Sequence, residues 1–262
     1  MEFKKFLNLI VNNEQDLKKS LPLLQAGRKE IQKGVFIGKN VLIEPNIFFD
    51  TSKGEIVIGD NTKIKANSIL RGPLIIGKNC VVNSFAEISS SRIADTCKIG
   101  GEMEHIVMQN YSNKSHHGYL GYSYIGNWVN IGGGTSVATL KNTYSLIKMG
   151  GVETGLQFLG CVIGDYSKTA INTSIFCGKV IGMSSHLYGT VTKDVPSFTS
   201  HIATGKLYEL PLEVAKKVQK AMAKRRQVEF TKKDHELFEK LFKTTALDRK
   251  MAKVKKGKLS FK

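Results

Sequence analysis

Residues 58–88 read IGDNTKIKANSILRGPLIIGKNCVVNSFAEI, and an apolar residue returns at every sixth position of this stretch. Those positions are Ile58, Ile64, Leu70, Ile76, Val82 and Ile88. A period of six fits neither the repeat of about 3.6 residues in a helix nor the two-residue repeat of an ordinary strand. It is typical of a coiled parallel sheet, in which short strands alternate with tight corners. The stretch therefore predicts an all-β main domain.

Ile-Gly dipeptides mark the same repeat along most of the chain. They occur at Ile37-Gly38, Ile58-Gly59, Ile76-Gly77, Ile99-Gly100, Ile125-Gly126, Ile131-Gly132, Ile163-Gly164 and Ile181-Gly182. Three hexapeptides make one triangular coil, in which each repeat isoleucine points inward and the following glycine relieves crowding at a corner. Coils stacked about 4.8 Å apart form three parallel sheets. Their isoleucines form a continuous apolar ladder, worth roughly 1.5–3 kcal/mol per buried side chain.

The rhythm divides the chain into three predicted parts. Residues 1–34 lack it and show helical spacing, which predicts an N-terminal helical arm. Residues 35–200 form the repeat domain, with breaks at residues 105–124 and 138–160. We interpret the first break as a loop that interrupts the coil, because function on a regular scaffold is expected where the rhythm fails. Residues 201–262 return to helical spacing and predict a basic C-terminal helical extension that ends in a solvated tail.

Positive charge is concentrated in this C-terminal extension. The chain of 262 residues has a formal net charge of +17, and residues 206–262 carry 18 Lys and Arg against 7 Asp and Glu. We interpret the extension as a helical cap over the open end of the prism, because an exposed coil edge needs covering. A field that steers anionic substrates is compatible with that role. The run Lys224-Arg225-Arg226 lacks interleaved aromatic residues, so no nucleic-acid partner is expected.

The cysteines and the apolar runs point to a reduced compartment. Cys80, Cys97, Cys161 and Cys177 form no CxxC pair and no zinc-ligand spacing, and we interpret them as buried core residues. No stretch approaches the length of a membrane span, and no signal-peptide pattern is present. These features predict a cytoplasmic protein with no membrane insertion and no metal site.

Polar residues gather in and after the first break. Residues 113–121 read NKSHHGYLG, and residues 124–135 read YIGNWVNIGGGT. These stretches resemble the acetyltransferase domain of the bifunctional glucosamine-1-phosphate acetyltransferase and N-acetylglucosamine-1-phosphate uridyltransferase family. They resemble in particular a divergent sugar-phosphate nucleotidyltransferase branch, which shares the LKNTY of residues 140–144 and the TGLQFLG of residues 154–160. The resemblance covers about residues 35–200 and does not include the nucleotidyltransferase half.

The resemblance implies a fold, an assembly and a reaction. The fold is a left-handed parallel β-helix of hexapeptide repeats, and the assembly is a homotrimer. The reaction is acetyl transfer from acetyl-CoA to an amino sugar phosphate, with His116 as the general base. A histidine that titrates near neutrality can remove the proton of an attacking amine, which is worth roughly 10²–10⁴-fold in rate. His117 is the nearest rival, and the spacing to Tyr119 favours His116.

The same resemblance assigns residues to the sugar. Tyr119 corresponds to a family tyrosine near the sugar phosphate, and Asn130 and Asn142 correspond to asparagines that hold the sugar. The Arg and Lys that bind the phosphate in the bifunctional enzymes have no match at their positions here. Three basic residues are candidates to replace them: Lys114, Lys141 and Arg92.

The donor side is also implied by the resemblance. Backbone donors around Gly133 would face the thioester carbonyl as part of an oxyanion hole. Ala170 and Gly189 are small residues in later coils, where the pantetheine arm of CoA would lie against the backbone between subunits. Lys206 would meet a CoA phosphate.

Two other functions are compatible with the sequence. One is acyl transfer to a nucleotide-linked sugar, with a longer acyl chain. Another is a non-catalytic trimeric scaffold or binding protein, which the missing Arg and Lys pair favours and the presence of His116, Tyr119 and Asn130 opposes. A separate nucleotidyltransferase is a possible partner, since the chain resembles only the acetyltransferase half of the family.

Overall fold

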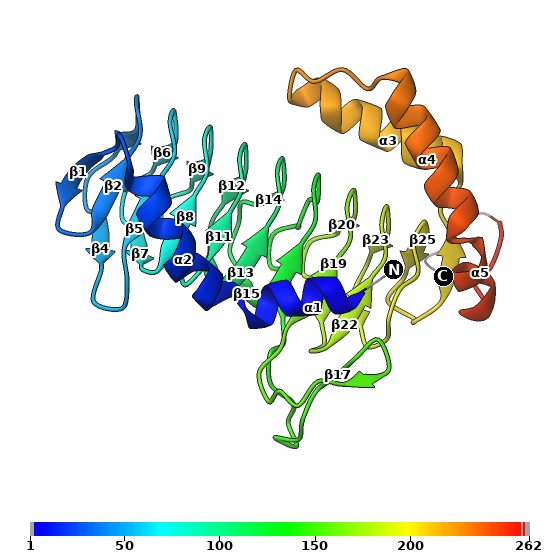
Figure 1. The fold of residues 1–262 in the computed structure, drawn as a ribbon. Coiled ribbons are helices and arrows are strands. Elements are labelled where there is room, and N and C mark those ends of the chain that lie inside the picture. Colours follow the sequence, from blue (N-terminus) through cyan, green and yellow to red (C-terminus); the bar gives the residue numbers. More distant parts are fainter. Residues whose placement is uncertain (1–2, 258, 260–262) are drawn as a thin grey trace.

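The computed structural model describes residues 3–257 and residue 259. Short parallel strands stack along one axis into a long β-solenoid, with helices at the N-terminal and C-terminal parts of the chain, as Figure 1 shows. Each coil has three faces, and the same face of successive coils forms a continuous parallel ladder. The predicted β-helix with helical segments at both ends is therefore confirmed.

We call the three faces of the solenoid the covered face, the cleft face and the third face. The covered face contains β2 (Val35–Ile37), β5 (Ile56–Ile58), β8 (Leu74–Ile76), β11 (Arg92–Ile93), the second halves of β13 (Glu102–Met108) and β15 (Tyr119–Ile125), β19 (Cys161–Ile163) and β22 (Lys179–Ile181). The cleft face contains β3 (Leu42–Ile43), β6 (Lys63–Ile64), β9 (Val81–Val82), β12 (Lys98–Ile99), β14 (Asn113–Lys114), β20 (Lys168–Thr169), β23 (His186–Leu187) and β25 (Thr199–His201). The third face contains β4 (Phe48–Asp50), β7 (Ile69–Arg71), β10 (Glu87–Ser89), the first halves of β13 and β15, β16 (Ser136–Val137), β21 (Ser174–Ile175) and β24 (Thr190–Val191).

The apolar ladder inferred from the six-residue period forms the main core. The fully buried repeat residues include Ile58, Ile64, Leu70, Ile76, Val82, Ile88, Ile163, Ile175, Ile181 and Leu187. Glycines that follow repeat isoleucines lie where coils touch: a Cβ added to Gly59 would be 2.5 Å from the carbonyl carbon of Gly77 in the next coil. The predicted role of glycine in relieving corner crowding is confirmed there.

The first predicted break is not a loop, and that interpretation is wrong. The strands β13 and β15 each bend across two faces and pair in parallel along most of their length, so the coil continues through residues 102–125. Met103, Met108, Lys114 and Leu120 occupy the inward positions of this coil. The period was hidden because methionine and lysine replace isoleucine and because some corners are shorter.

The second predicted break leaves the coil. Residues 138–160 carry a small antiparallel hairpin of β17 (Lys148–Met149) and β18 (Val152–Glu153). It hangs below the solenoid in Figure 1. Ile147 and Met149 pack beside the covered face, in a core cluster that includes Tyr124 of β15.

Two helices lie along the covered face. Helix α1 (Phe3–Val11) contacts β13, β15 and β19, and α2 (Asn13–Gln25) contacts β5, β8 and β13. Leu17 and Leu21 of α2 pack on Val57 and Ile75. The predicted N-terminal helices are present, and the pattern missed β1 (Lys29–Gln32), which pairs antiparallel with β2.

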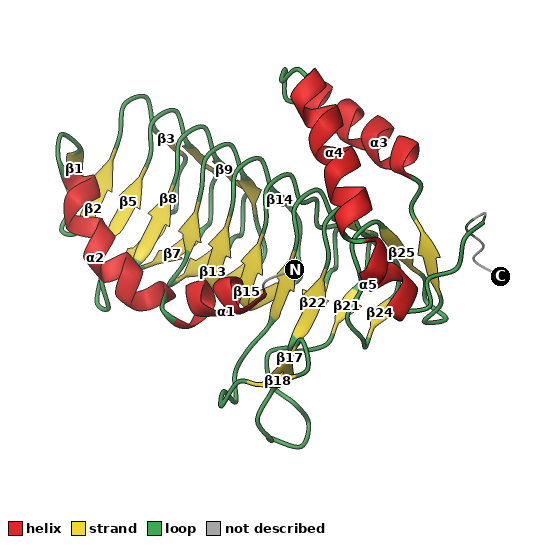
Figure 2. Ribbon diagram, turned by 45° about the vertical axis from the view of Figure 1, so that its right-hand side comes forward, coloured by secondary structure: helices red, strands yellow, loops and turns green. Residues whose placement is uncertain are grey.

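The C-terminal extension closes the last coil and turns back over the solenoid. Strand β26 (Leu207–Glu209) pairs antiparallel with β25. It is followed by α3 (Leu212–Arg225), α4 (Lys232–Thr244) and α5 (Ala246–Met251), which Figure 2 shows projecting beside the coils. Helix α4 begins with a capping box formed by Thr231 and Asp234. Within the described residues, no helix is both long enough and apolar enough to cross a membrane.

The prediction of a solvated tail is wrong for its first part. Val254 packs against the main core, and the carbonyl and amide of Lys255 bond to Glu209 and Leu207 of β26. These contacts cover the open end of the prism. The remainder of the tail, residue 258 and residues 260–262, lies outside the described residues.

Candidate active site

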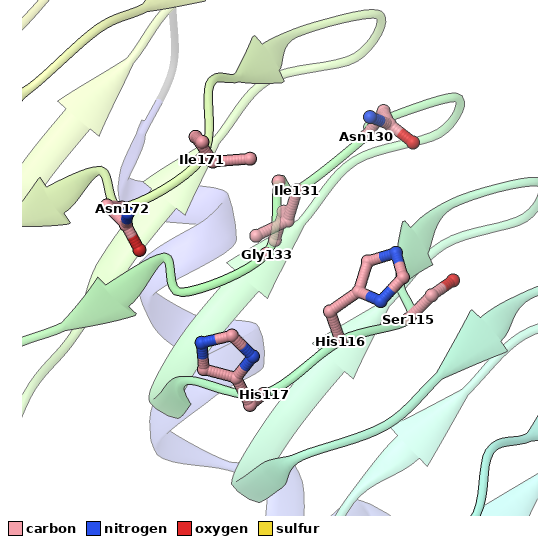
Figure 3. Close-up of a pocket in the computed structure, with 9 residues that line it drawn as sticks. Ser115, His116, His117, Asn130, Ile131, Gly133, Ile171 and Asn172 are labelled. Carbon is pink, nitrogen blue, oxygen red and sulfur yellow. The ribbon is translucent and has the colours of Figure 1, made fainter.

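Three consecutive corners between the cleft face and the third face surround a cavity of about 490 Å³. We call this cavity the corner pocket. The corners are residues 115–118, 132–135 and 170–173. The lining residues, most of them labelled in Figure 3, are Ser115, His116, His117, Asn130, Ile131, Gly132, Gly133, Ile171 and Asn172.

His116 is exposed on its corner and open to this pocket. A Cβ added to Gly133 would lie 3.3 Å from the Cβ of His116, so the next corner passes close above the imidazole without covering it by a side chain. Figure 3 shows the His116 ring on the side of Ser115 and Asn130, with His117 farther from both. The geometry therefore keeps His116 beside the predicted sugar-binding asparagine.

A second cavity, of about 660 Å³, lies between the outer surface of the cleft face and helix α3. We call it the α3 cleft. It shares Ser115, His116 and Asn130 with the corner pocket. Its other lining residues are Asn83, Lys98, Asn113, Lys168, Val218, Ala221, Met222, Arg225 and Arg226. His116 thus lines both cavities.

The α3 cleft is basic. Lys98 and Lys168 come from the strands and Arg225 and Arg226 from the end of α3, and none of the described residues that line the cleft is acidic. Burial lowers the pKa of Lys98, and the nearby Arg226 and Arg225 lower it further. Burial also lowers the pKa of Lys168 to about 8. Cations gathered without a neutralising carboxylate form a site that favours an anion.

A chain of hydrogen bonds links α3 to the pocket. The Arg226 guanidinium donates to Asn113 Oδ1, and Asn113 Nδ2 donates to Asn130 Oδ1 at 3.2 Å. This hydrogen bond fixes which end of the Asn130 amide faces Asn113 and leaves its Nδ2 available to donate to a ligand. The extension therefore orients a pocket residue as well as supplying charge.

Of the residues assigned from sequence, three come together. His116, Asn130 and Gly133 all line the corner pocket. Tyr119 lines neither cavity, and its hydroxyl donates to Glu104 Oε1 at 2.5 Å on the third face. Burial, together with this hydrogen bond, raises the pKa of Tyr119. Its predicted contact with a sugar phosphate is not supported by this position.

The candidate phosphate ligands lie elsewhere. Lys114 is buried inside the coil, which contradicts the predicted contact with a substrate. Arg92 lies on the covered face and donates to the Ser20 hydroxyl of α2 at 2.9 Å. Lys141 and Asn142 lie in the 138–160 excursion, where Lys141 donates to a loop carbonyl at 2.5 Å and Asn142 is exposed.

The residues that the resemblance assigns to CoA lie in successive coils toward the C-terminal end of the solenoid. Ala170 precedes Ile171, which lines the corner pocket. Gly189 has a φ of +75°, and a Cβ there would be 2.7 Å from the Cβ of Ala203, so this corner requires glycine. Lys206 lies between β25 and β26. Contact of these residues with CoA stays a prediction.

The sequence did not reveal the cations of the α3 cleft. Arg225 and Arg226 belong to a basic run that reads as a solvated helix face, and only the return of α3 over the coils brings them to His116. Asn113 lies in the motif of residues 113–121, and the resemblance implies no role for it. Across residues 3–257 and 259, no group of three or more His, Cys, Asp or Glu side chains is placed to hold a metal ion.

The parallel coil and the six-residue spacing of its buried ladder define a β-solenoid built from hexapeptide repeats. Residues 55–90 match the family described as bacterial transferase hexapeptide (six repeats). The chain is 28% identical over 193 residues to the bifunctional protein GlmU of Synechococcus elongatus, covering 66% of this chain and 39% of that protein. It is 28% identical over 169 residues to GlmU of a Nostoc species, covering 64% of this chain and 30% of that protein. The chain is thus similar to a part of GlmU and spans well under half the length of these proteins.

Two solved structures are similar to the chain at lower sequence identity. The UDP-N-acetylglucosamine acyltransferase of Arabidopsis has a TM-score of 0.47 at 17% identity, covering 85% of this chain and 89% of that chain. The enzyme of the same name from Francisella novicida has a TM-score of 0.45 at 16% identity, covering 84% of this chain and 76% of that chain.

Proposed function

We propose that the chain is an acyltransferase that moves an acetyl group from acetyl-CoA to the amine of an amino sugar phosphate. The observation that best supports this reaction is the position of His116, which lines both the corner pocket and the basic α3 cleft. A base between these two cavities can meet an amine whose phosphate lies among the cations. The match to a transferase repeat family and the relationship to GlmU support the same class of reaction.

In the proposed reaction, the amine nitrogen attacks the thioester carbonyl while His116 accepts the amine proton. A carbon–nitrogen bond forms, the carbon–sulfur bond breaks, and the thiol of CoA leaves with a proton returned by His116. The Gly132 N–H donates to Thr169 and the Gly134 N–H to the His117 carbonyl, so the Gly133 N–H is the candidate donor to the developing oxyanion on the corner that passes over His116. The Asn130 amide would donate to the sugar.

The phosphate of the acceptor would lie in the α3 cleft. Arg225 and Arg226 offer planar guanidinium groups that match phosphate oxygens, and Lys98 adds a point charge. In a hexosamine 1-phosphate, the amine and the phosphate are on adjacent carbons. The phosphates of CoA, by contrast, are separated from the thioester by the long pantetheine arm. A cation site that shares its wall with His116 therefore suits the acceptor better than the donor.

We also propose a homotrimer, with the CoA arm running along the corners of Ala170 and Gly189 toward Lys206. Sedimentation of the purified chain tests the assembly. A sedimenting species of one chain, under conditions where the enzyme turns over, would contradict a site shared between subunits.

The reaction is tested by following CoA thiol release from acetyl-CoA with a panel of amino sugars, amino sugar phosphates and nucleotide-linked amino sugars. Turnover is expected with the phosphorylated amino sugars. His116→Ala should lower kcat by roughly 10²–10⁴-fold, and His117→Ala should stay near the wild-type rate. Absence of turnover with the whole panel, or full activity of His116→Ala, contradicts the proposal. Preference for a nucleotide-linked sugar or a longer acyl thioester would move it to the alternative acyltransferase reaction.

The phosphate site is tested separately by a double variant, Arg225→Ala with Arg226→Ala. Loss of charge-assisted hydrogen bonds should raise KM for the phosphorylated acceptor by roughly tenfold or more and leave KM for acetyl-CoA unchanged. KM for the unphosphorylated sugar should rise less, because Arg226 also orients Asn130 through Asn113. The matched control is Lys217→Ala with Lys220→Ala, which removes two exposed charges of α3 outside the cleft. A change confined to acetyl-CoA would assign the cleft to the donor instead.

A further inference from the structure

Lys114 occupies an inward position that belongs to the apolar ladder. On the cleft face it pairs with Ile99 in the preceding coil, and its side chain points into the same core. It is only 1% exposed. Lysines are almost never buried this fully unless their charge is paired. Among the described residues, the hydrogen-bond partners of its ammonium are backbone oxygens and not carboxylates.

The three donors of the ammonium are all used by carbonyl groups around one corner. Lys114 Nζ donates to the carbonyls of Gly100 at 2.9 Å, His116 at 2.7 Å and Gly118 at 2.7 Å. Two of these acceptors belong to residues 115–118, the corner that carries His116. One of them is the carbonyl of His116 itself. The ammonium therefore holds this corner from inside the coil.

A shortened corner in the preceding coil explains why this position needs a lysine. Only Gly100, Gly101 and Glu102 separate Ile99 from the next ladder residue, whereas five residues follow Ile64 before Leu70. The short corner leaves room beneath residues 115–118, and the lysine side chain fills it. The fit of the lysine side chain in this space is tight, because a Cβ added to Gly101 would lie 2.6 Å from Lys114 Nζ.

We propose that Lys114 is a positioning residue, whose ammonium fixes the backbone of residues 115–118 and so the direction in which His116 enters the corner pocket. Burial lowers the pKa of Lys114 to about 8, so the cation is present at neutral pH. The part of this inference that concerns reaction rate depends on the proposed acyl transfer. The part that concerns the corner does not.

The test compares Lys114→Met with Val82→Ala, a cavity variant of the same ladder two coils away. Two readouts are used: hydrogen exchange of the amides of residues 115–119, and kcat with KM for acetyl transfer. Lys114→Met should speed exchange in this segment and lower kcat by roughly 10- to 100-fold, with KM for acetyl-CoA little changed. Val82→Ala should lose stability and change neither readout.

A second variant covers the case in which Lys114→Met does not fold. Lys114→Gln keeps a polar side chain at this position but lacks the ammonium and its three donors to the corner carbonyls, so it should show the same faster exchange and lower kcat. Unchanged exchange in residues 115–119 in both variants would overturn the inference, as would a wild-type kcat despite faster exchange. If the wild-type chain transfers no acyl group at all, the proposed reaction fails, while the exchange data still decide whether Lys114 holds the corner.

Discussion

The regular coils of residues 56–99 and the site coils of residues 102–201 share one winding but differ inside. On the cleft face, the regular coils have Ile64, Val82 and Ile99 at the ladder positions. The site coils have polar Lys114, Thr169 and His201 among theirs, all buried. The difference indicates that this fold can form the candidate site without a break in the coil. Polar side chains inside the coil, Lys114 and Thr169, replace apolar ladder residues and hydrogen-bond to the backbone of particular corners.

The regular coils show what the unmodified ladder does. Ile64 is fully buried in the main core and lines neither the corner pocket nor the α3 cleft. Its replacement by alanine should destabilise the fold by about 2–5 kcal/mol, because a cavity remains where the side chain packed. Urea unfolding measures this loss, and acetyl transfer at low temperature should keep the wild-type kcat.

The comparison breaks if Ile64→Ala loses activity while it is still folded. That result would mean that the regular coils communicate with His116 through the ladder. It would also remove the basis for using Val82→Ala as a neutral control for Lys114.

The sequence was informative about the fold wherever the ladder is apolar. The period through Ile58 and Ile88 predicted the coil because burial of a single repeated position dictates that spacing. It failed at Met103 and Lys114, where a flexible side chain and a buried cation occupy the same inward positions. A pattern that scores only branched apolar residues takes such a coil for a loop.

The site was predictable only where its residues are close in sequence. His116, Asn130 and Gly133 follow from one motif on neighbouring corners, and the corner pocket contains all three. Arg226 is more than ninety positions from Asn130, and its contact with Asn113 depends on the path of α3. Such placement is set by tertiary packing, which no local pattern records.

Histidine distribution gives a second way to sharpen the comparison. Residues 35–101 contain no histidine, whereas His186 lies on β23 among the site coils. Burial, and then the nearby Lys168, lower the pKa of His186 from the usual 6.5 to about 4. Between these values the unfolded chain binds more protons, so stability falls as the pH drops from 6.5 to 4. The loss should approach about 3 kcal/mol when complete.

Urea unfolding at pH 7 and pH 4.5 measures this effect, with His186→Gln as the control. The variant should be less acid-sensitive than the wild type, because it lacks the titrating group. Equal acid sensitivity of both proteins would show that His186 is not the group responsible. Hydrogen exchange should place the acid-induced opening in the site coils and leave residues 56–99 protected.

Thr169 provides the smallest and most direct test of the comparison. Its hydroxyl accepts from the Gly132 amide at 2.8 Å and shares a hydrogen bond with Thr135, so it holds the corner that passes over His116. Thr169→Val keeps the shape and makes the ladder apolar. If apolar bulk were all that the interior needs, this variant would be neutral or more stable. Because it leaves the Gly132 amide unpaired, we expect a loss of about 1–3 kcal/mol in urea unfolding. A gain in stability for Thr169→Val would show that the polar interior is not what supports the corners. The reciprocal variant in the regular coils, Val82→Thr, should also destabilise the fold, because its hydroxyl has no partner there.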